Sequence, residues 1–294
     1  TYTLQDLEQH FLKNNANLIA NEFNVRMADA NIIQEKLWDN PNLSISEVNL
    51  WKTSSVEDLP PLIGKYGRHQ QISVELEQVI ETAGKRKKRV ALKGLAKNGA
   101  LYDYEELMRT LKKDLRNAYY DLRRINRQEI QLNTMLDLFT QMSGQYERQA
   151  ELQNIRKADF YRVHTEMIGL KKEHIDLENE KWEALRELRV LTSLPTLDFN
   201  QITFAPENTL LNPSIWAIDR LELAKRQNLE LRRQDNEINK AQSELVLEKA
   251  ARTPNLTVQV NYDRAGNIMR DFFGIGVSAD LPIFNRNKGN IKAA

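Results

Sequence analysis

Cysteine is absent from this 294-residue sequence. Its absence excludes disulfide bonds, thiolate metal sites and a lipidated N-terminal cysteine within these residues. The first residue is Thr1 rather than an initiating methionine, and no signal peptide follows it. We therefore interpret the start as a processed or trimmed N-terminus.

Glycine and proline are scarce, at 11 and 8 residues, which favours long helices over compact globules. No run approaches the roughly eighteen apolar residues typical of a membrane-spanning helix. An excess of charge of one sign is also missing, because 42 basic side chains nearly balance 41 acidic ones. Nucleic-acid binding needs a basic face, so no nucleic-acid partner is predicted. The dense basic run at residues 85–89 is either a site for anionic lipid phosphates or a solvated first helical turn.

The apolar residues of segment 85–152 keep one spacing, three then four, along its whole length. The first position of this heptad holds Leu101, Met108, Leu115, Leu122, Glu129, Leu136, Ser143 and Ala150, and the second holds Tyr104, Leu111, Ala118, Ile125, Leu132, Phe139 and Tyr146. Only Glu129 and Ser143 interrupt the repeat. At about 1.5 Å per residue such a helix is on the order of 100 Å long. The sequence therefore predicts a rod that supercoils left-handedly against a partner helix.

Two segments before this rod have strand patterns. Residues 43–50 form the first, with a phase slip at Glu47 that indicates a bulge, and residues 53–69 form a loop. Residues 72–80 form the second, in which alternate side chains are apolar. Its apolar row is Ile72, Val74, Leu76 and Ile80 with the polar Gln78 among them, and its polar row is Ser73, Glu75 and Glu77.

A second hairpin pattern occupies residues 256–283. Its apolar rows are Val258, Val260 and Tyr262 on one strand and Ile275, Val277, Ala279 and Leu281 on the return strand. Strands of about nine residues match tilted strands that cross a bilayer. Four strands cannot close on themselves, so insertion would require several copies of the chain. The alternative is two soluble hairpins with one wet face.

Three further segments have helical patterns. Residues 3–39 are predicted as one helix that is capped by Thr3, with Asp6 close to a capping-box position. Residues 157–191 return along the rod after a break near Gln153 and Asn154, and residues 213–252 follow a connector at 194–211.

The returning helix carries two adjoining apolar stripes. One stripe is Phe160, Val163, Met167, Leu170, Leu177, Ala184, Leu188 and Leu191, and the other is Tyr161, Ile168, Ile175 and Trp182. A face this wide can pack against two neighbours, as the wall of a helical tube requires. The alternative is a buried helix of a bundle.

The hairpins belong to an internal repeat. Setting residue 41 against residue 254 aligns Pro-Asn-Leu with Pro-Asn-Leu, after a helix and before a strand in both copies. The predicted first repeat, 1–211, contains a helix, a hairpin at about 42–80, a long helical hairpin at about 85–192 and a connector. The second, 212–294, contains a helix and a hairpin at about 256–283 and stops before its long helices.

With these motifs the sequence resembles the TolC-like outer-membrane efflux family over essentially all of its length. Besides the two Pro-Asn-Leu motifs, the resemblance depends on the runs 77–86 (EQVIETAGKR) and 281–289 (LPIFNRNKG). These runs resemble the heavy-metal cation efflux branch, in which a strand ends in a Gly-Lys-Arg or Leu-Pro-x-Phe-Asn turn before the long helix.

The resemblance implies a mainly α fold with a small β part. Long coiled-coil helices would form an α-barrel tunnel in the periplasm, and four strands per chain would contribute to a trimeric, 12-stranded barrel in the outer membrane of a Gram-negative bacterium. The implied function is passive conduction of metal cations or drugs from periplasm to exterior. The implied partners are two further copies of the chain, a periplasmic adaptor protein, an inner-membrane pump of the resistance-nodulation-division class, and outer-membrane lipid.

Two sets of site residues follow from this resemblance. The first is a periplasmic tip that contacts the adaptor, at Leu152, Gln153, Asn154, Ile155 and Arg156. The second is a set of lipid-facing strand residues, at Ile72, Val74, Leu76, Val258, Val260, Tyr262, Ile275, Val277 and Leu281. The given sequence ends where the family's second descending helix should begin, so either the chain is a fragment or the rest lies outside the residues given. The family's entrance-gating residues belong to that missing part, and none is assigned here.

The sequence contains no constellation of residues for catalysis, a cofactor or a bound metal. Its histidines, His10, His69, His164 and His174, are scattered and form no His-Glu-x-x-His motif. The Gly84-Lys85-Arg86 turn lacks the earlier glycine and the following Ser or Thr of a phosphate loop. We therefore predict that the protein is not an enzyme. The alternative to the efflux channel is a soluble coiled-coil scaffold whose hairpins form small caps.

Overall fold

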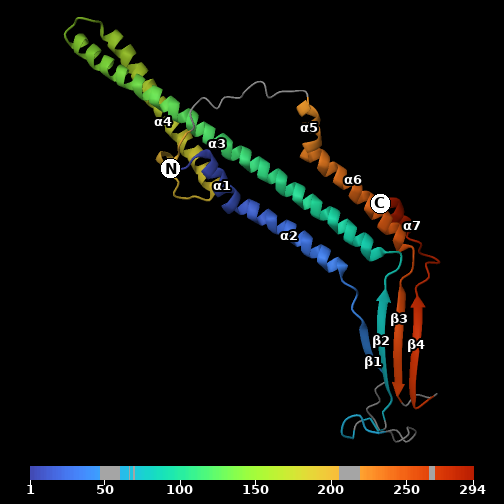
Figure 1. The fold of residues 1–294 in the computed structure, drawn as a ribbon. Coiled ribbons are helices and arrows are strands. Elements are labelled where there is room, and N and C mark those ends of the chain that lie inside the picture. Colours follow the sequence, from blue (N-terminus) through green and yellow to red (C-terminus); the bar gives the residue numbers. More distant parts are fainter. Residues whose placement is uncertain (47–59, 66, 69, 205–218, 265–268) are drawn as a thin grey trace. The chain divides into compact units, whose positions relative to one another are not determined.

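A computed structural model describes residues 1–46, 60–65, 67–68, 70–204, 219–264 and 269–294. Its helices are α1 (Leu4–Asn14), α2 (Ala16–Lys36), α3 (Lys85–Glu151), α4 (Lys157–Thr192), the 3₁₀ turn η1 (Phe199–Gln201), α5 (Asp219–Gln227), α6 (Leu229–Ala251) and α7 (Lys288–Ala293). Its strands are β1 (Asn42–Ser46), β2 (Ile72–Ile80), β3 (Leu256–Arg264) and β4 (Asp271–Ala279). The predicted fold class, mainly helical with four strands, is confirmed (Figure 1).

The chain forms two compact units, and each combines two separate segments. The helical unit contains Thr1–Asn24 and Tyr102–Leu229, and the sheet unit contains Val25–Leu101 and Glu230–Ala294. This division differs from the two sequence repeats, which stay a prediction. The long helix α3 is continuous over 67 residues, as the heptad pattern predicts, and contributes to both units.

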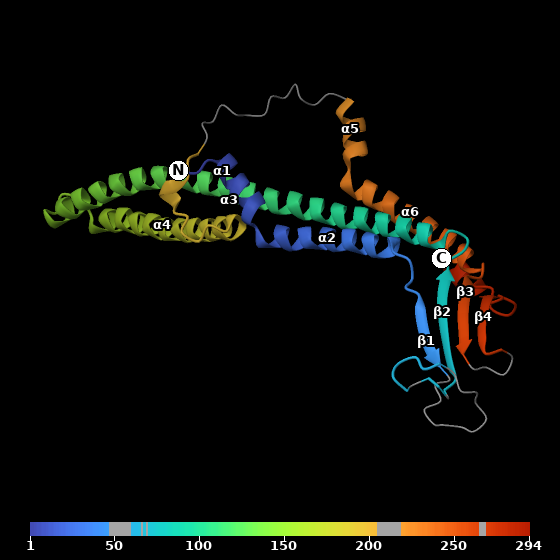
Figure 2. The same cartoon turned by 60° about the horizontal axis from the view of Figure 1, so that its bottom comes forward.

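The core of the helical unit lies where α1, α3 and α4 meet. Figure 2 shows α4 running back alongside the C-terminal part of α3. Heptad positions such as Leu115, Leu122 and Ile125 are almost fully buried, as is Leu188 of α4. Both interruptions of the heptad have polar partners on α4. The Lys181 ammonium lies 2.8 Å from Glu129, and the Ser143 hydroxyl lies 3.2 Å from His164 Nδ1.

The single helix predicted for residues 3–39 is wrong, because the chain breaks between α1 and α2. The predicted Thr3 cap is present as a full capping box with Asp6. The break lies at Asn15, whose side-chain amide donates to the Leu191 carbonyl at 2.9 Å. Its side-chain oxygen accepts from the backbone of Leu18 and caps α2.

The other predicted boundaries differ in detail. The helix predicted at 213–252 is divided into α5 and α6 around Asn228, and residues 213–218 lie outside the described part of the chain. The first strand is described only to Ser46, so the bulge predicted at Glu47 also lies outside it. The break between α3 and α4 is confirmed, with Gln153 in a left-handed conformation at φ +59°.

In the sheet unit the strands form an antiparallel sheet in the order β1-β2-β3-β4 (Figure 1). The outer pairs are hairpins, and the central pair joins Ile72–Ile80 to Leu256–Arg264. A tight turn connects β2 to α3, in which Ala83 and Gly84 both have positive φ and the Lys85 amide donates to the Thr82 carbonyl at 3.2 Å.

An ion-pair cluster fixes this turn to the neighbouring helix. The Arg89 guanidinium makes two hydrogen bonds to the Glu81 carboxylate, at 2.5 and 2.9 Å, and a third to Glu35 of α2 at 2.8 Å. The hydrogen bonds from Arg89 lower the pKa of Glu81 below its ordinary value. These contacts hold β2, α2 and α3 together at the junction.

Replacing Asn15 with alanine should destabilise the helical unit. The substitution removes the cap of α2 and leaves the Leu191 carbonyl without its donor, at an expected cost of about 1–3 kcal/mol. Chemical denaturation followed by circular dichroism measures the change. Asn14→Ala is the matched control, because the Asn14 side chain is exposed and should change stability by less than about 0.5 kcal/mol. Equal effects of the two substitutions would contradict the role assigned to Asn15.

The Glu81–Arg89 contact predicts a pH dependence of stability. The pKa of Glu81 is lower in the folded than in the unfolded chain, so its contribution is complete above its unfolded pKa and is lost as the pH falls through the folded pKa. The stability difference between the wild type and Glu81→Gln should therefore be constant above about pH 5 and shrink as the pH is lowered below the unfolded pKa. Urea unfolding at a series of pH values measures it. Glu237→Gln, in an exposed pair with Lys240, is the control. A difference that grows on acidification would refute the prediction.

Candidate functional site

The register of the sheet places most of its apolar residues on one face. Residues directly opposite each other on antiparallel strands point to the same side. The cross-strand rows on this side are Leu43, Leu76, Val260 and Ile275; Ile45, Val74, Tyr262 and Phe273; Gln78, Val258 and Val277; Ile80, Leu256 and Ala279; and, at the other end of the strands, Ile72, Arg264 and Asp271. We call this side the apolar face. Gln78 is a polar member of this face, as the sequence pattern predicts, and Arg264 and Asp271 are charged members at its Ile72 end.

The apolar face is exposed in the single chain. The exposed fraction of the side chain reaches 82% at Ile275, and Leu43, Ile45, Phe273 and Val277 are also mostly exposed. A contiguous apolar surface of this extent marks a site of contact with another apolar phase or partner.

The structure brings together eight of the nine residues predicted to face lipid. Two details differ from the prediction. Ile72 lies on the apolar face, as predicted, but its side chain is only 8% exposed. Leu281 lies beyond the end of β4, because Ala279 pairs with Leu256, the first residue of β3, and no partner strand extends further. The assignment of Leu281 to a strand is therefore wrong.

The opposite side of the sheet is polar and acidic, and we call it the polar face. Its members include the carboxylates of Glu75, Glu77 and Asp263. Within β1–β4 as described, no lysine or arginine occupies this side. The Gln259 amide donates to the Glu77 carboxylate at 2.5 Å, which links β2 to β3.

Glycine at position 274 is required by the packing of this face. A Cβ at Gly274 would lie 2.2 Å from the side-chain oxygen of Asn261 on β3. The glycine therefore leaves room for the Asn261 amide to lie flat on the sheet. Phe272 lies beside Gly274 on the same side of the sheet, and the next two positions on this side of β4, Gly276 and Ser278, are small.

The predicted tip residues lie together in the turn between α3 and α4 (Figure 1). The backbone amide of Asn154 donates to the Gln149 carbonyl at 2.9 Å, and its side-chain amide donates to the Gln149 side chain at 2.8 Å. Leu152 is 67% exposed although it is apolar. The turn is thus fixed by the end of α3 and presents an uncovered leucine.

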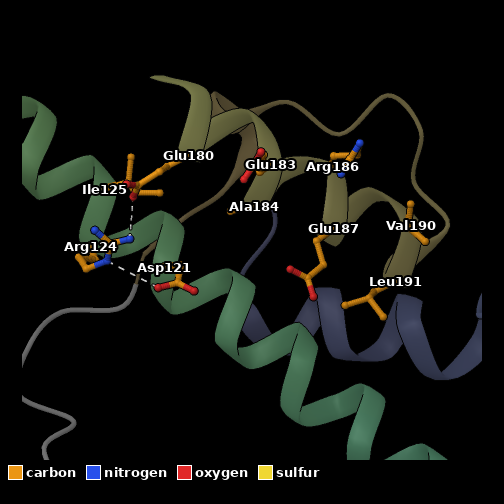
Figure 3. A pocket seen from close by; sticks show the side chains of 10 residues that line it. All are labelled: Asp121, Arg124, Ile125, Glu180, Glu183, Ala184, Arg186, Glu187, Val190 and Leu191. Atoms are coloured by element: carbon orange, nitrogen blue, oxygen red, sulfur yellow. Dashed lines mark hydrogen bonds and ion pairs between the residues drawn. The ribbon is translucent and has the colours of Figure 1, made fainter. Parts of the chain in front are cut away.

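A groove of about 850 Å³ lies between α3 and α4 in the helical unit (Figure 3). Its floor includes Ile125 and Leu191. Its rim carries Asp121 and Arg124 from α3 and Glu180 from α4. Arg124 lies 3.0 Å from Glu180 and 3.6 Å from Asp121, and the hydrogen bond with Glu180 raises the pKa of the guanidinium above its ordinary value.

Sequence reasoning missed this groove. The sequence pattern that could have indicated it is a row of glutamates at helical spacing on one face of α4, at Glu180, Glu183 and Glu187. The carboxylate of Glu180 already has a cationic partner in Arg124.

One apolar stripe of α4 packs against α3 and the other does not. Met167, Leu177, Leu188 and Leu191 of the first stripe are buried, whereas Tyr161, Ile168, Ile175 and Trp182 of the second are 53–59% exposed. The seven-residue spacing of the second stripe matches a coiled-coil seam. A single chain leaves this seam without a partner helix.

Within the described ranges, no three His, Asp or Glu side chains form a group able to hold a metal ion. None of the helices described has both the length and the apolar character needed to cross a membrane.

No protein-family model matches the chain, and no curated protein matches it in sequence. Solved structures do match. CusC, described as forming a transmembrane channel, aligns at 14% identity with a TM-score of 0.77 over 99% of this chain and 68% of its own. The outer-membrane channel CmeC of Campylobacter jejuni aligns at 14% identity and a TM-score of 0.71, over 99% and 64%. The outer-membrane protein VceC of Vibrio cholerae aligns at 13% and 0.72, over 99% and 71%.

The chain thus spans about two thirds of the length of these proteins. The alignments cover 99% of this chain. The chain therefore has the TolC-like fold of outer-membrane efflux channels, as the sequence resemblance predicts.

Proposed function

We propose that this chain is a subunit of an outer-membrane channel of a tripartite efflux system, through which substrate passes without chemical change. The observation that supports this most directly is the sheet, with an exposed apolar face on one side and an acidic polar face on the other. In a closed membrane barrel the apolar face contacts lipid and the polar face lines the lumen.

The unpaired edges of the sheet favour a homotrimer. In the described chain β1 and β4 are edge strands with no partner on their outer sides. Unpaired backbone groups cannot be left in lipid, so the sheet must close with other copies. Three copies supply twelve strands, as the resemblance implies. The exposed stripe of α4, from Tyr161 to Trp182, would then pack against a neighbour in the tunnel wall.

The polar face points to cationic substrates. A lumen lined by Glu75, Glu77 and Asp263 attracts cations and repels anions, because the low-dielectric wall strengthens their field. This is consistent with the sequence resemblance to the heavy-metal cation branch. Metal cations, or cationic drugs, are therefore the proposed substrates.

The remaining parts fit the same proposal. The tip residues 152–156 would contact a periplasmic adaptor, since the turn is fixed and Leu152 is uncovered. An inner-membrane pump of the resistance-nodulation-division class would supply the energy. The sheet would lie in the outer membrane of a Gram-negative bacterium, and the long helices would extend into the periplasm.

Neutralising the polar face should reduce cation selectivity. In planar bilayers under a KCl gradient, Glu75→Gln combined with Glu77→Gln should lower the ratio of K⁺ to Cl⁻ permeability about threefold or more, because two of the three carboxylates are lost. Reversal potentials measure the ratio.

Glu237→Gln removes one carboxylate from α6 and serves as the control, with no expected change. An unaltered permeability ratio in the double variant would show that the polar face does not line the lumen. A protein that needs no detergent and gives no conductance would instead be the soluble scaffold, against the proposed function.

Charge at the tip should uncouple the channel from its adaptor. Asn154→Glu combined with Ile155→Glu places two carboxylates in the turn, and should abolish efflux-dependent resistance in the host while trimers form normally on non-denaturing gels. Lys171→Glu changes an exposed position on α4 away from the tip and should leave resistance intact. Full resistance in the tip variant would exclude these residues from adaptor contact.

A further inference from the structure

A pocket of about 450 Å³ lies in the sheet unit, where β2 turns into α3. Three cationic side chains line it, Lys36 from α2 and Arg86 and Lys87 from the first turn of α3, together with Trp38 and the Glu81 carboxylate. The pocket therefore contains two residues of the basic run that the sequence singles out, together with an aromatic ring from another segment.

The positive charge of this pocket is only partly balanced from within, because one carboxylate, that of Glu81, faces three cations. The Glu81 carboxylate already accepts both hydrogen bonds from the Arg89 fork. Across the part of the chain that is described, no carboxylate lies within ion-pair distance of Lys36, Arg86 or Lys87, and α3 has no acidic residue in its first turn. An anion is the missing complement.

Arg86 is held in place but incompletely hydrogen-bonded. Its guanidinium carbon lies 3.7 Å from the centre of the Trp38 ring, a cation–π contact. Its Nη1 is buried, with no acceptor among the described residues. A buried guanidinium donor without an acceptor is costly, and an anion bound beside Arg86 would compensate for its charge.

The pocket lies at the end of the apolar face. Gln78, a polar member of that face, donates its side-chain amide to the Asp39 carbonyl at 3.0 Å, so the segment next to Trp38 crosses the same side of the sheet. Trp38 is 60% exposed, and Leu37 beside it is exposed as well. Tryptophan with arginine and lysine at the boundary of an apolar surface is the pattern that meets lipid head groups.

We propose that this pocket binds a phosphate group, supplied by a phospholipid head group of the leaflet into which the sheet inserts. The lipid source rests on the proposed function, because it requires the apolar face to be in a membrane. The phosphate chemistry depends only on the three cations, the orphaned donor of Arg86 and the volume of the pocket. Bound there, the phosphate would link α2 to α3 through a shared anion.

The test measures lipid retention on the purified protein in neutral detergent by native mass spectrometry. Phosphatidylglycerol is the probe, and diacylglycerol with the same acyl chains is the phosphate-free reference. Arg86→Gln combined with Lys87→Gln should weaken phosphatidylglycerol binding about tenfold or more, because two of the three cations are lost. Lys87→Glu alone, at an exposed side chain, should weaken it similarly and is not expected to disturb folding.

The matched control is Lys88→Gln. Lys88 belongs to the same basic run, but its ammonium donates to the Ala83 carbonyl and it lines a different pocket beside α6. Wild-type affinity in this variant supports a specific pocket, whereas an equal loss would reduce the effect to bulk charge and overturn the proposal. Unchanged binding in the double variant, or equal binding of diacylglycerol, would overturn it too.

Inorganic phosphate separates the two sources of the anion. If millimolar phosphate displaces phosphatidylglycerol completely, the site is a free-phosphate site and the lipid source is refuted. Displacement that needs far higher phosphate supports the head group. The proposed function fails independently, through absence of the wild-type protein from the membrane fraction, and the phosphate titration still tests the pocket in that case.

Discussion

The register between β2 and β3 is the constraint on which the rest of the sheet unit depends. Side chains alternate with a period of two, so a slip of one residue would move Glu75 and Glu77 among the apolar rows and leave Val258 and Val260 among the carboxylates. The contact between Gln259 and Glu77 and the contact between Gln78 and Asp39 fix opposite faces at the same end of the strands. One aligned pair of strands thereby separates a surface suited to lipid from one suited to water and cations.

Most of the helices and strands could be predicted from the hydrophobic periodicity of the sequence. The heptads of α3 and the alternation of β2, β3 and β4 are local patterns, and the tertiary packing agrees with them. Even the interruptions were informative, because Glu129 and Ser143 lie at positions that face α4. Their partners, Lys181 and His164, could not be predicted from the sequence. Which residues of α4 lie opposite Glu129 and Ser143 depends on the axial offset between the two helices, and the packing of their apolar side chains sets that offset.

The features that escaped prediction are nonlocal. Asn15 lies inside a continuous helical pattern, and its break is stabilised by the Leu191 carbonyl, 176 residues away. The groove beside Arg124 and the pocket around Arg86 each require side chains from different elements to converge. The basic run was visible in the sequence, but Trp38, which orders Arg86, lies before the first strand and carries no periodic signal. Residue composition and hydrophobic periodicity locate helices and strands in the sequence. A site forms only where side chains of different helices and strands come together, and no local pattern records that.

The central strand pairing also has a consequence for biosynthesis. Glu77 and Gln259 are 182 residues apart. A ribosome at about 5–20 residues per second therefore takes on the order of ten seconds or more to deliver β3 after β2. During that interval the first hairpin has an unpaired backbone edge beside an apolar surface. Such an edge can pair wrongly with strands of other nascent chains. A holding factor that shields this edge until the last hairpin arrives would raise the yield of correctly folded protein.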